Sequence, residues 1–181
     1  RYSLMSAMDD RFYKLEQLHG ETGAQLIAES HCRAIDLIED IVKKENIDCD
    51  FKRLDGYLFA SPDDTSELDK ELDAAHRAGL IDVKRVLSPP QQPQLGAALL
   101  FPRQGEFQPL AYLAGLARAI QAKGGLLYDQ THVSQVNDDD TQPSVTTSHG
   151  STIKASAIVM ATNSPIHSPE FSLKQAAYNT Y

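Results

Sequence analysis

The stretch SAIVMATNSP, residues 156–165, places small residues directly after an apolar run. Residues 158–160 predict a buried strand, and Ala161, Thr162 and Asn163 form the turn at its carboxyl end. Ligands bind at that end of open α/β sheets, where small side chains let backbone N–H groups approach a phosphate. Upstream, the backbone of Val133 could hydrogen-bond the edge of an adenine. The four residues are candidate contacts for a dinucleotide, and the alternative is a plain αβ unit with an ordinary turn.

Three further residues are candidates for a substrate pocket. Arg103 lies close to Gln104 and Glu106, and a guanidinium can hold a carboxylate through two parallel hydrogen bonds. Tyr57 and Phe59 are two residues apart in a strand-like run, so they share one face, which could line an apolar pocket. The alternatives are a solvated arginine and half-exposed aromatic side chains without a function.

Other kinds of catalytic chemistry lack the residues that they need. The histidines are scattered, and no G-x-S-x-G stretch exists that would expose a serine nucleophile. Cys32 and Cys49 are the only cysteines, and no second pair of ligands stands at zinc spacing. We expect two buried thiols in a reduced, cytoplasmic protein and no metal centre. The alternative is a disulfide or a metal site.

Composition narrows the range of partners. The 181 residues carry a net charge of −8 without a cluster of lysines and arginines, which argues against a nucleic-acid partner. No apolar run approaches the ~20 residues that cross a bilayer, so we expect no membrane partner.

The first half of the chain predicts three helices and a hairpin. Apolar spacing indicates a helix over 4–18, followed beyond Gly20 and Gly23 by a second helix, the longest element. Asp55 and Gly56 suit the turn of a hairpin within 50–60. The acidic residues of 61–64 open a third helix, which Gly79 ends.

The second half is expected to alternate between strands and one helix. Residues 83–88 predict a short strand, and residues 97–109 a strand, a turn and an extended piece. Pro109 begins a helix with a buried apolar face, which Gly124 and Gly125 end. The remaining elements are all β structure: a strand at 126–128, an extended piece at Val133, a hairpin turning at 148–150 and the terminal strand at 158–160.

Several stretches, in this order, resemble FAD-dependent oxidoreductases of the D-amino acid oxidase superfamily, which includes glycine and sarcosine oxidases. The stretches are DFKRLDGYLFA, AALLFPRQGEFQPLAYLAGLARAIQAKGG, THVSQV and IVMATNSP. They are most similar to a bacterial branch in which some members carry a C-terminal Rieske domain, where a closing segment like residues 174–181 also recurs. The resemblance covers nearly the whole chain.

The resemblance implies an α+β fold: the antiparallel or mixed sheet of the substrate domain with flanking helices, plus part of an FAD-binding αβ domain. It divides the chain into a linking helical segment (1–46), a substrate-domain sheet and helix (47–108) and the later part of the FAD domain (109–181). The turn at 161–163 and the backbone of Val133 would contact FAD. Two departures from the family are Asn163, where glycine is common, and Gln108, where close relatives often have histidine.

The family's G-x-G-x-x-G loop for the FAD pyrophosphate has no counterpart in this sequence. We therefore expect an internal fragment of an enzyme that oxidises an amine or amino acid by hydride transfer to FAD. Alone, it would bind FAD weakly or not at all and could self-associate through an exposed apolar surface. The alternative is a cofactor-free α+β binding module.

Overall fold

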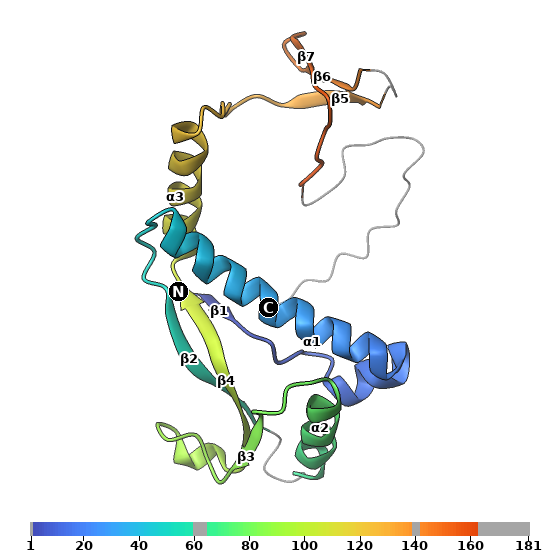
Figure 1. Cartoon of the computed structure of the whole chain (residues 1–181), viewed down its shortest axis with the longest axis vertical. Helices are drawn as coiled ribbons and strands as arrows, with labels where there is room; N and C mark the ends of the chain where they lie inside the picture. Colours follow the sequence, from blue (N-terminus) through green and yellow to red (C-terminus); the bar gives the residue numbers. More distant parts are fainter. Residues whose placement is uncertain (1, 60–64, 139–141, 163–181) are drawn as a thin grey trace. The chain divides into compact units, whose positions relative to one another are not determined.

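The computed structural model describes residues 2–59, 65–138 and 142–162 (Figure 1). The chain forms two compact units, Arg1–Leu126 and Leu127–Tyr181, which are described separately below.

A four-stranded antiparallel sheet forms the centre of the first unit. Its strands are β1 (Tyr2–Leu4), β2 (Lys52–Phe59), β3 (Lys84–Val86) and β4 (Ala98–Phe107). β2 pairs along one edge of β4, and β1 and β3 pair with opposite ends of its other edge. The short strand predicted within 83–88 is confirmed as β3.

The predicted hairpin at 50–60 is wrong, because β2 is one continuous strand with a bulge. Its register with β4 shifts between Leu54 and Gly56, so that Pro102 and Arg103 of β4 stand opposite Asp55. Gly56 is buried with a negative φ, and a Cβ there would lie 2.8 Å from Cε of Met5. Gly56 therefore provides room for a close contact rather than a turn. The turn predicted within 97–109 is likewise this bulge.

α1 (Phe12–Lys44) is the longest helix, and it crosses one face of the sheet (Figure 1). Its backbone is kinked at Gly20 (φ 72°, ψ 171°), which confirms the expected break there. The helix predicted over 4–18 is wrong in its first half. Residues 2–4 hydrogen-bond with β4 instead, and Arg11 adopts a positive φ of 59° immediately before the helix begins. Of the predicted helix, Leu4 pairs in the sheet and residues 5–11 lie outside any helix or strand.

α2 (Ser66–Arg77) packs against α1 and ends as the sequence predicts. Gly79 has φ +94° and donates its N–H to the carbonyl of His76, while Leu80 donates to Ala75. These two bonds form a Schellman motif, which favours glycine at this position. The acidic segment 61–64 expected to open the helix lies outside the described residues. The short 3-10 helix η1 (Pro93–Leu95) follows β3.

Glu71 of α2 caps the start of α1. Its side chain is 1% exposed, and Oε2 accepts the backbone N–H of Tyr13 at 3.3 Å. Phe12 also donates a backbone hydrogen bond to this carboxylate. The N-cap residue of α1, Arg11, makes no side-chain cap bond. Because the first turn of a helix leaves N–H groups without partners, a residue distant in sequence provides the missing acceptor.

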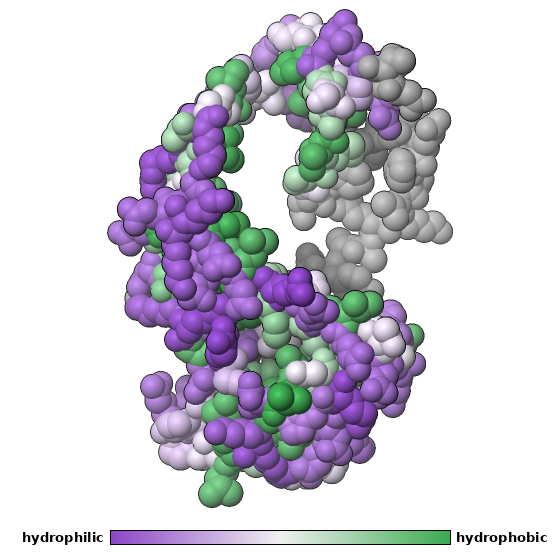
Figure 2. Space-filling model, viewed as in Figure 1, coloured by the Kyte–Doolittle hydropathy of each residue, from purple (hydrophilic) through white to green (hydrophobic). Residues whose placement is uncertain are grey.

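α3 (Pro109–Ala122) begins with proline as predicted, but it buries a different face. Gly115 is its one buried residue, and it packs directly on Ile47. The residues predicted to be buried are largely exposed, Leu110 at 81%, Leu113 at 58% and Ile120 at 45%. Figure 2 shows this apolar surface along α3. The missing Cβ of Gly115 determines which face contacts Ile47, and periodicity alone does not reveal it.

The second unit contains a three-stranded antiparallel sheet of β5 (Val133–Asn137), β6 (Ser144–Thr147) and β7 (Thr152–Lys154). The predicted turn between β6 and β7 is confirmed, with Gly150 at φ +81°. The predicted strands at 126–128 and 158–160 are wrong: both segments lie outside any strand, and Val159 is 88% exposed. A strand requires a hydrogen-bonded neighbour, and no described segment pairs with either of them.

Two apolar clusters form the core of the first unit. The larger one joins α1 and α2 to the sheet through Phe12, Leu68, Leu99 and Phe101. The smaller one, around Ile47, Cys49 and Phe107, joins α3 to the end of α1. These clusters hold one face of the sheet against the helices, which decides where the candidate site residues lie.

Candidate functional site

Tyr57 and Phe59 lie on the face of the sheet that α1 and α2 do not cover. Leu58 pairs with Leu99, and both belong to the core beneath the helices. Because side chains alternate along a strand, Tyr57 and its partner Leu100 point the opposite way. Phe59 is 49% exposed. Tyr57 and Leu100 are half-buried there, and the exposed Lys84, which pairs with Leu100, lies on the same face.

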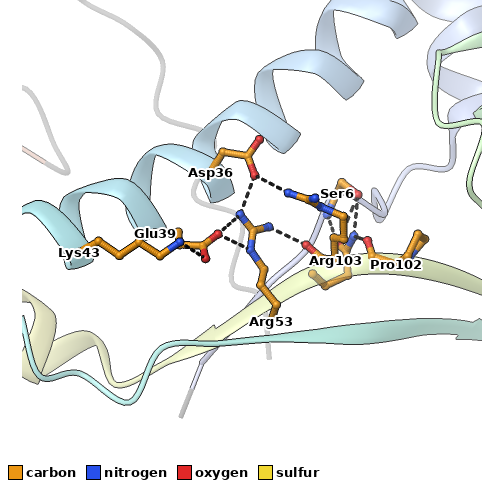
Figure 3. Close-up of polar contacts among 8 residues, drawn as sticks. Ser6, Asp36, Glu39, Lys43, Arg53, Pro102 and Arg103 are labelled. Carbon is orange, nitrogen blue, oxygen red and sulfur yellow. Dashed lines mark hydrogen bonds and ion pairs between the residues drawn. The ribbon is translucent and has the colours of Figure 1, made fainter.

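Arg103 lies on the helical side instead, so the structure does not bring the three predicted pocket residues together. Its guanidinium is 3.7 Å from Oδ1 of Asp36, a residue of α1 (Figure 3). Nor does Gln104, one of its expected neighbours, join it in a clamp. Gln104 is buried, and its amide is hydrogen-bonded with Ser6 and the carbonyl of Pro102.

Sequence reasoning missed Arg53, which is the centre of the polar contacts in Figure 3. Its Nε donates to Glu39 at 2.8 Å, and the other two nitrogens donate at 2.6 Å to Asp36 and to the carbonyl of Arg103. Asp36 and Glu39 are three residues apart, so both acids lie on one side of α1. This spacing is the sequence signal that could have indicated a basic partner such as Arg53. These contacts anchor the helix to the bulge of β4.

The ionisation of this cluster follows from its contacts. Hydrogen bonds from Lys43, and then from Arg53, lower the pKa of the Glu39 carboxyl. Partial burial lowers the pKa of Arg53, but its bonds to Glu39 and Asp36 outweigh that effect and raise it. Glu39 and Arg53 are therefore both held in their charged forms, which suits a structural connection rather than proton transfer.

The two thiols are free and unreactive. Cys49 is buried, and Cys32 is partly buried beside Ser6. Burial raises the pKa of both, so neither is a thiolate at neutral pH. Within residues 2–59, 65–138 and 142–162, no group of histidines, cysteines and acids could hold a metal ion.

The candidate FAD contacts lie in the second unit. Val133 begins β5, an edge strand whose outer backbone groups have no partner within the described sheet. Such an edge can accept an adenine through backbone hydrogen bonds. Ala161 and Thr162 are exposed and outside any helix or strand, so their backbone is accessible to a phosphate. Asn163 lies outside the described residues. The residues present thus fit the adenosine side of FAD.

No helix in the described part of the chain is long and apolar enough to cross a membrane.

The chain is similar to oxidoreductases over most of its length. The family model for FAD dependent oxidoreductases (DAO) matches residues 12–176. A Bacillus subtilis protein whose name describes a Rieske 2Fe-2S iron-sulfur protein, YhfW, is 30% identical over 90% of this chain and 32% of its own length. Gamma-glutamylputrescine oxidoreductase of Escherichia coli is 25% identical, over 82% of this chain and 36% of its own.

Solved structures of the same fold superpose on a similar part of this chain. Glycine oxidase from Geobacillus kaustophilus superposes with a TM-score of 0.60 at 21% identity, over 76% of this chain and 39% of that one. L-proline dehydrogenase from P. horikoshii superposes with a TM-score of 0.57 at 16% identity, over 83% of this chain and 38% of that one. The predicted α+β fold is confirmed.

The chain spans about a third of the length of these curated relatives. The matches confirm the predicted resemblance, and they give no support to a cofactor-free binding module. Because one family model matches nearly all of the sequence, the chain belongs to the family of FAD dependent oxidoreductases.

Proposed function

We propose that the protein containing this chain oxidises the C–N bond of a small amine or amino acid. The observation that carries the proposal is the family match over residues 12–176. Two relatives named for an amine and an amino acid, gamma-glutamylputrescine oxidoreductase and glycine oxidase, support the substrate class. When bound, FAD supplies the hydride acceptor.

In this proposal the chain contributes two surfaces. The open sheet face with Tyr57 and Phe59 orients the apolar part of the substrate and excludes water from it. The edge of β5 at Val133 and the accessible backbone of Ala161 and Thr162, together with Asn163, hold the adenosine and pyrophosphate of FAD. The proposed division is a linking segment (1–46), a substrate sheet (47–108) and the later FAD domain (109–181).

The two surfaces are tested separately in the protein expressed from its complete gene. Val133→Pro removes a backbone N–H at the edge of β5, whereas Val133→Ala keeps it. Proline should weaken FAD binding at least tenfold, measured by flavin fluorescence, and alanine should not. Equal FAD affinity in both variants, with the hairpin intact by circular dichroism, would remove Val133 from the site.

The substrate face is tested with Tyr57→Ala and Phe59→Ala. We expect KM to rise for amine-dependent reduction of an electron-accepting dye, with FAD content unchanged. The matched control is Leu18→Ala, because Leu18 is an exposed apolar residue of α1, away from that face. A protein that binds FAD but oxidises no amine or amino acid would refute the substrate class alone.

We also propose that the protein is cytoplasmic, which its free thiols support. The isolated chain is proposed to self-associate through the exposed apolar residues of α3, Leu110, Leu113 and Ile120. Sedimentation velocity should show association that Leu110→Glu reduces. A chain that remains monomeric at high concentration would refute it.

A further inference from the structure

A pocket of about 230 Å³ lies on the helical side of the first unit's sheet. Its floor is apolar and formed by Ile35, Val83 and Phe101, which are 4%, 3% and 0% exposed. Arg103 and Asp36 stand at its rim, with side chains 74% and 52% exposed. A volume of this size admits a small organic molecule.

The guanidinium of Arg103 is mostly uncommitted among the described residues. Its one ion pair there is the 3.7 Å approach to Asp36, and Asp36 already accepts a 2.6 Å bond from Arg53. A guanidinium has five N–H donors, so most of those on Arg103 remain for another acceptor. Arg53 differs, because each of its three nitrogens already donates to a protein oxygen.

The backbone of Arg103 is held in an unfavourable conformation that presents this side chain. Its φ is 57°, inside a strand, a backbone conformation that residues with a Cβ rarely adopt. The bond from Arg53 to the Arg103 carbonyl, 2.6 Å long, fixes that conformation. Glycine would fit this backbone at lower cost, so the arginine side chain has a use that packing does not explain.

The charges around the pocket narrow the ligand. Asp36 and Asp82 also line it, and so does Arg53, whose guanidinium already donates to Glu39 and Asp36. Because Arg53 is committed to these acids, the aspartates would repel a second negative charge brought to Arg103. A single carboxylate can pair with Arg103 while an aliphatic tail contacts the apolar floor. We propose that this pocket binds a small aliphatic monocarboxylate through Arg103. The site is separate from the surface with Tyr57 and Phe59, and its existence does not depend on the proposed oxidation.

The test is a titration of the ¹⁵N-labelled full chain with three probes of equal size. 3-Methylbutanoate carries the charge and the tail, 3-methylbutanamide only the tail, and malonate two charges without the tail. Saturable shifts are expected with 3-methylbutanoate at the Arg103 Nε–H and at the amides of Leu80 and Phe101. The amide should bind at least tenfold more weakly, because a charge-assisted hydrogen bond contributes more than that factor. Malonate should also bind at least tenfold more weakly, because it lacks the apolar tail and its second charge meets Asp36 and Asp82.

Variants separate binding from folding. Arg103→Gly should abolish the shifts while the chain becomes no less stable, because glycine relieves the positive φ. Arg33→Gln is the matched control: Arg33 is an exposed arginine of α1, paired with Glu29, and its loss should leave binding unchanged. Equal binding of the amide, retained binding in Arg103→Gly, no saturable shift, or shifts at Tyr57 and Phe59 would each overturn the proposal.

Discussion

Replacing Glu71 by alanine should destabilise the contact between α1 and α2. Glu71 is 1% exposed and accepts backbone hydrogen bonds from Phe12 and Tyr13 at the start of α1. Removing the carboxylate leaves these N–H groups without an acceptor where water cannot reach. An unsatisfied buried donor costs about 1–3 kcal/mol, so we expect a loss of about 2 kcal/mol. For a chain of this size that corresponds to a fall in Tm of roughly 4–8 °C.

Glu71→Gln distinguishes the acceptor from the charge. The amide oxygen can still accept from Tyr13, so this variant should retain at least about 1 kcal/mol more stability than Glu71→Ala at neutral pH. Oε1 of Glu71 has no partner among the described residues, so the substitution breaks no hydrogen bond at that atom. Glutamine also removes the ionisable group, so it isolates the pH dependence.

The sign of that dependence follows from burial, which raises the pKa of Glu71 above its ordinary value despite the two backbone hydrogen bonds. The folded state therefore holds this proton more tightly than the unfolded chain does. The resulting stabilisation is complete below the ordinary pKa of a carboxyl and is lost as pH rises through the folded-state pKa. We expect urea unfolding to show that, between pH 4 and pH 8, the free energy of unfolding of the wild type falls relative to that of Glu71→Gln.

Two results would refute this reasoning. If Glu71→Gln is as unstable as Glu71→Ala at neutral pH, the ionised charge matters more than the acceptor. If the stability difference between wild type and Glu71→Gln does not change with pH, the carboxyl is not perturbed by its burial. Circular dichroism at 222 nm reports the helices directly in both experiments.

Three further perturbations test other contacts by urea unfolding. Gly115→Ala would place a Cβ 2.4 Å from Cγ2 of Ile47, so it should lower the free energy of unfolding by about 1–3 kcal/mol. The control Ala114→Gly, on the exposed face of α3, should lower it by about 1 kcal/mol. Gly79→Ala forces φ +94° on a residue with a Cβ and should cost about 1 kcal/mol or more, while no loss would contradict the Schellman motif. Arg53→Gln should cost about 1–3 kcal/mol at neutral pH. Because Lys43 and Arg53 lower the pKa of Glu39, that loss should shrink as pH falls through the folded-state pKa of Glu39, and a pH-independent loss would contradict it.

Local signals in the sequence predicted the elements whose ends are set by backbone chemistry. Pro109 begins α3, Gly79 ends α2, Gly20 breaks α1 and Gly150 turns the hairpin of the second unit. Each of these residues restricts or frees φ by its own covalent structure, so the outcome depends little on distant contacts. The resemblance to the family likewise rested on several short stretches in a fixed order.

The remaining features depend on residues far apart in the chain. Residues 4–18 have helical spacing, yet Leu4 pairs with Gly105 of β4, about 100 residues away, and residues 5–11 lie outside any helix or strand. Asp55 and Gly56 were predicted at a hairpin turn, whereas Asp55 instead lies opposite Pro102 and Arg103 in a bulge between paired strands. Arg103, Tyr57 and Phe59 were predicted to share one pocket because their side chains suit a substrate. Strand alternation and the bulge instead place Arg103 and Tyr57 on opposite faces of the sheet.

Each of the other strands in the first unit's sheet pairs only with β4 within the described residues. β1 and β3 occupy opposite ends of one edge, so either can fray while the other stays in place. Opening β4 itself would break all three pairings at once. Amide hydrogen exchange should therefore be slowest for β4 and occur in one cooperative step there, with β1 and β3 exchanging earlier and independently.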